Sequence, residues 1–207
     1  VFQFVKDQNK VVMSHAGEPK NCWLPIDEMT VNNDREYFSE NPEYHMYLHP
    51  EMPSYEDQIN ARNNMLEKNK DMTFIAVHLA TLEWSVDEIA AFLDRFPNAS
   101  VDVAERLSHL QVQSIKDRQK VRNFIIKYQD RILYGTDFQE LEDTNPSELK
   151  EGMLNTWMQD WKYLNTDEVM TAHQVNAEFQ GLKLPKSVVD KIYLTNAQKI
   201  FPNAWEN

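Results

Sequence analysis

Three apolar runs in this chain end abruptly in a polar residue, and this feature limits its fold more than any other. The runs are VVMSH at 11–15, TFIAVH at 73–78 and RILYGTD at 131–137. Nearly continuous apolar runs of this length are typical of strands covered on both faces. A fourth β-branched run, ASVDVAE, occupies 99–105. Longer helical patterns separate the four runs, and this alternation predicts an α/β protein with mostly parallel strands.

Four segments carry apolar residues at helical spacing, and we expect them to cover the sheet. The clearest pattern begins at Ser85, which has Glu88 three residues later as in a capping box. The predicted helices span residues 55–69, 85–96, 114–129 and 185–201.

Two further stretches lack this regularity. Residues 18–53 are rich in proline and aromatic residues without a sustained period, which predicts a long ordered excursion. Such an excursion is either a binding surface or an insertion that only packs against the sheet. Residues 139–173 contain NTWMQDWKYLN, which predicts a packed helix with Trp157 and Trp161 on one face rather than a ligand site.

Composition and net charge limit the kinds of molecule that the chain is expected to bind. With 42% hydrophobic and 26% charged residues, the 207-residue chain is expected to form one domain, 1–207, around a packed core. A net charge of -12 disfavours nucleic acid and anionic membranes, so a small-molecule substrate is the expected ligand. The single cysteine, Cys22, excludes an intramolecular disulfide and a cysteine-rich zinc module. The cellular compartment stays open.

The polar residues that close the strands are the candidates for chemistry. Carboxyl ends of parallel strands line the mouth where ligands bind, and His15, His78 and Asp137 are expected there. Each side chain has an ordinary alternative, a hydrogen-bonded position in the core or at the surface. Together, imidazole and carboxylate groups suit zinc or another divalent ion, which lowers the pKa of bound water. Two ligands are too few for a catalytic zinc site, which typically has three.

Five segments in order resemble the later barrel of the amidohydrolase family related to aminocarboxymuconate-semialdehyde decarboxylase. They are MSHAGEP at 13–19, FIAVHLATLEW at 74–84, FPNASVDVAER at 96–106, DRILYGTDF at 130–138 and LTNAQKIF at 194–201. The resemblance implies the later half of a (β/α)8 TIM barrel and one divalent ion, usually zinc. It implies that His15 and Asp137 bind the metal and that His78 is the catalytic histidine, with Gly135 and Thr136 completing the G-[ST]-D motif.

The chain departs from that family pattern at one point. The family's first strand supplies a His-x-His pair, and no such pair occurs in residues 1–207. The first four strands are therefore expected to be absent, which would leave open sheet edges. The chain is then expected to need a missing amino-terminal half-barrel as a partner, another copy of itself, or an unusual closure of the sheet.

Three other residues are candidates for substrate binding. Glu18 either orients His15 or contacts substrate, unless it is a solvated loop carboxylate. Trp23 has similar alternatives. Arg106 either pairs with a substrate carboxylate or bridges to Asp102 or Glu105.

The leading hypothesis is a metal-dependent hydrolase whose metal-activated water attacks an amide, ester or lactone carbonyl, with His78 assisting by proton transfer. A non-oxidative decarboxylase on the same site is the first alternative. A non-catalytic half-barrel that binds a ligand or assembles with a partner is the second.

Overall fold

The computed structural model describes residues 1–142 and 144–205, and its centre is a parallel sheet. The sheet has the order β1-β2-β3-β4, and all three pairings are parallel. Its strands are β1 (Val12–Ser14), β2 (Phe74–Ala76), β3 (Ala99–Asp102) and β4 (Ile132–Leu133). The four predicted strands and their parallel arrangement are confirmed, and each is shorter than its apolar run.

Helices connect the strands and follow them. The α-helical elements are α1 (Phe2–Asp7), α2 (Asn32–Glu40), α3 (Tyr55–Glu67), α4 (Val77–Ala80), α5 (Val86–Arg95), α6 (Leu107–Lys127), α7 (Pro146–Asn165), α8 (Lys186–Asp190) and α9 (Asn196–Ile200). Short 3-10 turns are η1 (Lys20–Trp23), η2 (Ile26–Glu28), η3 (Pro42–Tyr44), η4 (Met46–Leu48) and η6 (Pro202–Ala204), and η5 (Lys191–Thr195) is a π-helical turn.

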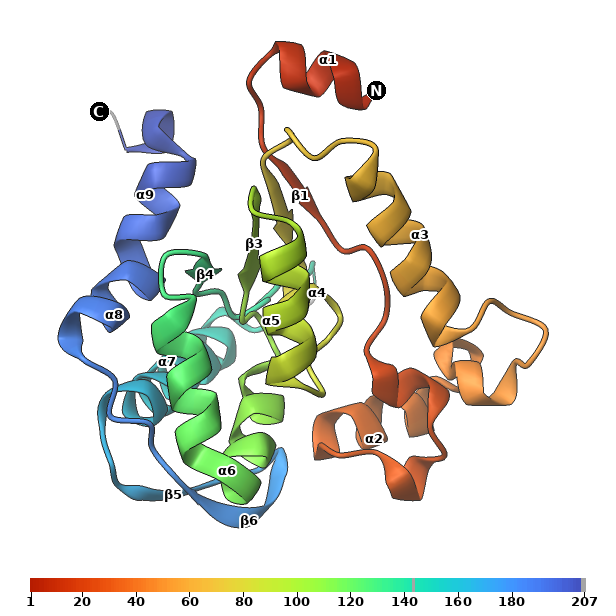
Figure 1. Ribbon diagram of the computed structural model, residues 1–207. Coiled ribbons are helices and arrows are strands. Elements are labelled where there is room, and N and C mark those ends of the chain that lie inside the picture. Colours follow the sequence, from red (N-terminus) through yellow and green to blue (C-terminus); the bar gives the residue numbers. More distant parts are fainter. Residues whose placement is uncertain (143, 206–207) are drawn as a thin grey trace.

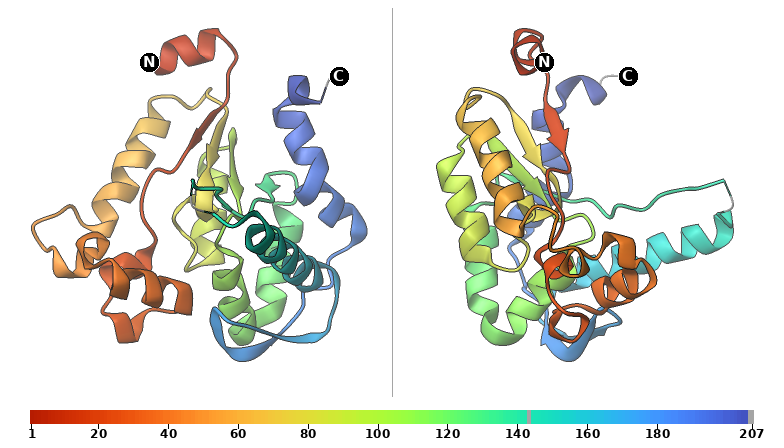
Figure 2. Two further views of the ribbon diagram at one scale, coloured as in Figure 1. Left: turned by 180° about the vertical axis from the view of Figure 1, so that it is seen from behind. Right: turned by 90° about the vertical axis from the view of Figure 1, so that its right-hand side faces the viewer.

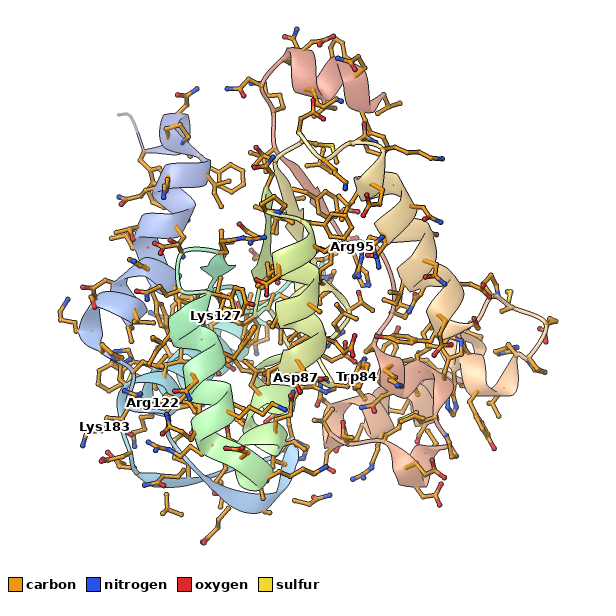
Figure 3. All side chains as sticks on the ribbon, viewed as in Figure 1. Trp84, Asp87, Arg95, Arg122, Lys127 and Lys183 are labelled. Carbon is orange, nitrogen blue, oxygen red and sulfur yellow. The ribbon has the colours of Figure 1, made fainter. Side chains whose placement is uncertain are left out.

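The two faces of the sheet are covered differently. Helices α3, α5 and α6 lie along one face, whereas the segment after β4 and helix α7 extend from the other (Figure 2). The largest core cluster joins apolar side chains of the sheet, α5 and α6, and Phe74, Ile89 and Leu110 in it are fully buried. The outer surfaces of α5 and α6 are charged, with Asp87 and Lys127 at the surface (Figure 3).

The predicted helices are present, with three differences in detail. The helix predicted at 114–129 begins earlier, at Leu107, and is interrupted by non-helical dihedral angles at Asp117. Ser85 caps α5 by accepting a hydrogen bond from the amide of Glu88 (3.4 Å), but the reciprocal capping box occurs at α3, between Ser54 and Asp57. The predicted helix at 185–201 is divided, because the π-helical turn η5 separates α8 from α9. No helix of the described residues is long and apolar enough to cross a membrane.

Two structures gather at the carboxyl ends of the strands. The excursion at 18–53 folds into short turns and α2, and a hairpin of β5 (Val169–Ala172) and β6 (Val175–Gln180) lies at the same end (Figure 1). The two meet directly, since the side-chain amide of Asn32 donates to the carbonyl of His173 (2.7 Å) and to Oδ1 of Asn176 (2.8 Å). The excursion is ordered, as expected, whereas the hairpin was not predicted.

Helix α7 contains the tryptophan-rich segment but does not bury it. Trp157 and Trp161 are 41% and 47% exposed, while Tyr163 and Leu164 on the same helix are buried. The prediction of a helix is confirmed, but only its last turns pack against the core, because the buried residues of α7 are Asp160, Tyr163 and Leu164. The amino-terminal part of the helix extends away from the sheet (Figure 2).

Candidate active site

The three strand-end residues predicted from the sequence come together. The imidazole rings of His15 and His78 meet edge to face with their centroids 4.8 Å apart. Nε2 of His78 lies 3.9 Å from Oδ2 of Asp137. His78 is buried, while the side chains of His15 and Asp137 are 45% and 43% exposed. The group therefore has a buried histidine at its base and two accessible donors at its mouth.

A strained turn holds His78 in place. Strand β2 ends at Ala76, two residues before the predicted end, and the four residues from His78 to Thr81 all have positive φ angles between 54° and 59°. Non-glycine residues avoid this left-handed region because Cβ crowds the following carbonyl, at a cost of about 1 to 2 kcal/mol per residue. Strain of this kind persists only where surrounding contacts fix it, and it gathers at functional sites.

Side chains from several elements fix this turn by binding its backbone. The hydroxyl of Tyr55 on α3 donates to the carbonyl of Thr81 (2.6 Å), and the hydroxyl of Thr81 donates to the carbonyl of Gly17 (3.0 Å). The buried guanidinium of Arg62 donates to the carbonyl of Ala80. Helix α3 and the segment after β1 are therefore both tied to the turn that carries His78.

The same turn leaves one ring nitrogen of His78 available. Nδ1 lies 3.0 Å from the carbonyl oxygen of Ala104, which can only accept a hydrogen bond. Nδ1 must then carry the proton, so in the neutral ring the lone pair is on Nε2, facing Asp137. This is the tautomer needed by a base or a metal ligand.

A cleft of about 750 Å³ opens beside Asp137. Its walls come from the start of α6, the middle of α7, the tip of the β5–β6 hairpin and the residues that follow β4. Its lining residues include Asn33, Glu105, Ser108, Asp137, Phe138, Asp160 and His173. Its volume suits a small-molecule ligand.

Asp160 is the buried carboxylate of the cleft. It is 9% exposed, and its Oδ2 accepts a hydrogen bond from the hydroxyl of Tyr134 (2.8 Å). Burial raises the pKa of Asp160 to about 6, and the Tyr134 hydrogen bond offsets part of that rise. Nothing in the sequence distinguishes this aspartate from the other acidic residues of the tryptophan-rich segment.

The three candidate substrate-binding residues have different surroundings. Glu18 is half exposed, with Oε1 3.5 Å from Nε2 of His15. The indole of Trp23 donates to the carbonyl of Pro53 (3.2 Å) and packs against the small cluster around Cys22, away from the cleft.

Arg106 is buried and pairs with a neighbouring glutamate. Its Nη1 lies 2.7 Å from Oε2 of Glu105, and its Nε has no hydrogen-bond partner within the described part of the chain. Arg106 was predicted either to pair with a substrate carboxylate or to bridge to Asp102 or Glu105, and the structure contains the ion pair with Glu105. Its side chain does not line the cleft.

The side chains at the site are of the types that bind zinc, but fewer are in place than a catalytic zinc site needs. Within residues 1–142 and 144–205, no three His, Cys, Asp or Glu side chains are placed to hold an ion. His15, His78 and Asp137 offer the imidazole and carboxylate donors that zinc prefers. Cys22 is buried, and burial raises the pKa of its thiol to about 11, so it is not a thiolate ligand here.

A parallel sheet with histidine and aspartate side chains at its carboxyl ends defines an α/β protein with an enzyme-like site. The family model described as amidohydrolase matches residues 43–202, and the chain belongs to this family. The matched range includes His78 and Asp137, whereas His15 precedes it. No curated protein and no solved structure matches the chain. Membership supports a hydrolase-type enzyme.

Proposed function

We propose that this chain carries part of the active site of a metal-dependent hydrolase that acts on a carbonyl substrate. In the proposed roles, His15 and Asp137 bind one divalent ion, most simply zinc, and His78 transfers the proton. The observation that carries the proposal is the convergence of the three side chains, with the His15 and His78 rings 4.8 Å apart and His78 3.9 Å from Asp137. When bound, such an ion activates water and polarises a carbonyl group.

The role of His78 rests on its own contacts. Its N–H at Nδ1 is occupied by the Ala104 carbonyl, so proton exchange is left to Nε2 at the edge of the site. The strained turn and the hydrogen bond from the His78 amide to Asp102 (2.8 Å) limit movement of the ring. A base held at a fixed position contributes about 10²- to 10⁴-fold to the rate of a proton transfer.

The relation to aminocarboxymuconate-semialdehyde decarboxylase belongs to the same proposal. It rests on the five sequence segments named above, of which all but MSHAGEP at 13–19 lie in the family match. Decarboxylation would release carbon dioxide from a carboxylated substrate, whereas hydrolysis would not, so product analysis separates the two reactions.

The divalent-metal content of the purified chain tests the proposed function. About one equivalent is expected in the native chain, with loss of it in His15→Ala and in Asp137→Asn. His49→Ala is the matched control, because His49 bonds to the carbonyl of Pro42 (3.0 Å) and pairs with Glu51, apart from the site. Metal retained in His15→Ala would contradict the proposed ligand.

A second candidate, a half-barrel that assembles with a partner, is favoured by the sheet edges. Among the described strands, β1 pairs only with β2 and β4 only with β3. Met13 on β1 is 61% exposed. Open edges of this kind are templates for further pairing. Absence of metal from both the native chain and His15→Ala would favour this candidate over the hydrolase.

A further inference from the structure

We propose that the cleft beside Asp137 receives an amine-bearing, cationic arm of the substrate, and that Asp160 binds its ammonium group. This inference rests on the proposed function, because it assigns the substrate class of the same site. It concerns the part of the cleft formed by α6, α7 and the hairpin, while Asp137, a proposed metal ligand, lines the same cleft.

The charges that line the cleft favour a cation. Its described lining includes the carboxylates of Glu105, Asp137 and Asp160 and contains no Lys or Arg. Glu105 is neutralised by Arg106, which lies outside the lining, but no Lys or Arg pairs with Asp160 in the described part of the chain. Asp137 is taken by the proposed metal, so Asp160 is the carboxylate of the lining that is left for a ligand. A carboxylated substrate arm beside Asp160 would meet its negative charge without a Lys or Arg of the described lining to bind it.

Two polar residues of the lining also carry atoms without a partner. Ser108 is 7% exposed, and its Oγ has no hydrogen-bond partner among the described residues. The buried Oδ1 of Asn33, on α2, also lacks a partner in that part of the chain. A buried polar group without a partner costs about 1 to 3 kcal/mol, so a ligand group that reaches one of these atoms gains a contact. The amide oxygen of Asn33 only accepts, which suits the three donors of an ammonium group, while the Ser108 hydroxyl can donate or accept.

Asp160 is a buried residue whose carboxylate is only partly hydrogen-bonded. The residue is 9% exposed, and the hydrogen bond from Tyr134 engages only Oδ2. Phe138, which is 40% exposed, lines the same cleft and adds an aromatic ring, a group that attracts cations. A carboxylate and an aromatic ring thus line a space of about 750 Å³, together with Asn33 and Ser108.

Three probes with one ring and different arms test the charge preference. They are tryptamine, tryptophol and indole-3-acetate, which end in an ammonium, a hydroxyl and a carboxylate group. Titration calorimetry of the native chain at neutral pH should give tryptamine the lowest Kd, at least about tenfold below that of indole-3-acetate, as expected for one charge-assisted hydrogen bond. Indole-3-acetate binding as tightly as tryptamine would overturn the proposal without any variant.

Variants then locate the binding group. Asp160→Asn keeps the acceptor for Tyr134 and should weaken tryptamine binding by about tenfold or more while leaving tryptophol within about twofold. Asp167→Asn removes the same charge from an exposed residue that pairs with Lys183, outside the cleft, and is the matched control. Equal effects of the two variants would overturn the assignment to Asp160.

His15→Ala separates this inference from the proposed function. If the metal proposal fails and the inference holds, the metal content will not depend on His15, while tryptamine binding still depends on Asp160. If the inference fails and the metal proposal holds, His15→Ala loses metal and the three probes show no preference for the ammonium arm.

Discussion

The backbone amide of His78 donates a hydrogen bond to the buried carboxylate of Asp102, on the neighbouring strand, over 2.8 Å. The same Oδ1 also accepts from the amide of Ala104 (3.2 Å). One side-chain atom therefore fixes both the left-handed turn after β2 and the chain after β3. The proposed base and the carbonyl that selects its tautomer are held by a single acceptor.

Replacement of Asp102 should therefore show whether the turn needs the charge of the carboxylate or only a hydrogen-bond acceptor at this position. Asp102→Ala leaves two buried amides without an acceptor and is expected to lower the free energy of unfolding by about 2 to 4 kcal/mol. Asp102→Asn retains an oxygen at the same position and should cost less than about half as much. Urea denaturation followed by circular dichroism measures both, and equal losses would show that the acceptor does not stabilise the turn.

The strands were predictable because their signal is local. The apolar runs of β2 and β4 are buried, so the pattern of the sequence directly reflects the burial. Strand β1 forms as predicted but is not covered on both faces, since Met13 is 61% exposed. The same signal placed His15, His78 and Asp137 at the strand ends. It gave no sign that β2 would stop at Ala76, because a run of left-handed residues without glycine is fixed by distant contacts from Tyr55 and Arg62.

The β5–β6 hairpin and the cleft could not be predicted, because no local pattern of apolar residues in the sequence marks them. Only Met170 in β5, with Val175 and Phe179 in β6, is buried, and a register shift falls between Met170 and Ala172, which disturbs the alternation expected of a strand. The cleft joins segments that are more than a hundred residues apart, from α2 to the hairpin. Asp160 could be recognised only once these segments were together.

Substitution by alanine at two glycines should change the stability of the fold in opposite directions. A methyl group at Gly181 would collide with the backbone carbonyl of Thr166, so Gly181→Ala is expected to destabilise the fold by about 1 to 3 kcal/mol. At Gly152, inside α7, the nearest atom to a new methyl group is 3.7 Å away on Phe138, an ordinary contact. Gly152→Ala should then stabilise by about 0.5 to 1 kcal/mol through helix propensity. Thermal melts of both variants check the two signs.

The thiol of Cys22 should be unreactive in the folded protein. It is fully buried, its Sγ donates to the carbonyl of Tyr44 (3.0 Å), and burial raises its pKa to about 11. With an unfolded pKa near about 8.5, the thiolate fraction at neutral pH falls by about 10²-fold or more on folding. A disulfide reagent should label the thiol slowly in buffer and rapidly in urea, and fast labelling in buffer would contradict the burial.

Asp160 should make stability depend on pH in a defined direction. Burial raises the pKa of its carboxyl from an ordinary 3.8 to about 6. Between these values the folded chain holds a proton that the unfolded chain has released, so the free energy of unfolding falls as the pH rises through this window. Below it both states are protonated and the cost is absent, whereas above about pH 6 the cost is complete.

Asp160→Asn removes the free-energy cost of burying an ionised carboxylate, because an amide side chain does not titrate. Relative to the native chain, the variant is expected to gain about 1 to 3 kcal/mol of stability between pH 4 and pH 7.5, since each pKa unit corresponds to about 1.4 kcal/mol. Asp167→Asn is the control that should show almost no difference between these two pH values, because hydrogen bonding to Lys183 lowers the pKa of that exposed carboxyl from an ordinary 3.8, which puts its titration below this pH range. Urea denaturation at both pH values measures the difference, and a constant difference for Asp160→Asn would show that its carboxylate is not buried at a cost. A gain in stability joined to weaker binding of tryptamine would mean that Asp160 is kept charged for its ligand rather than for the fold.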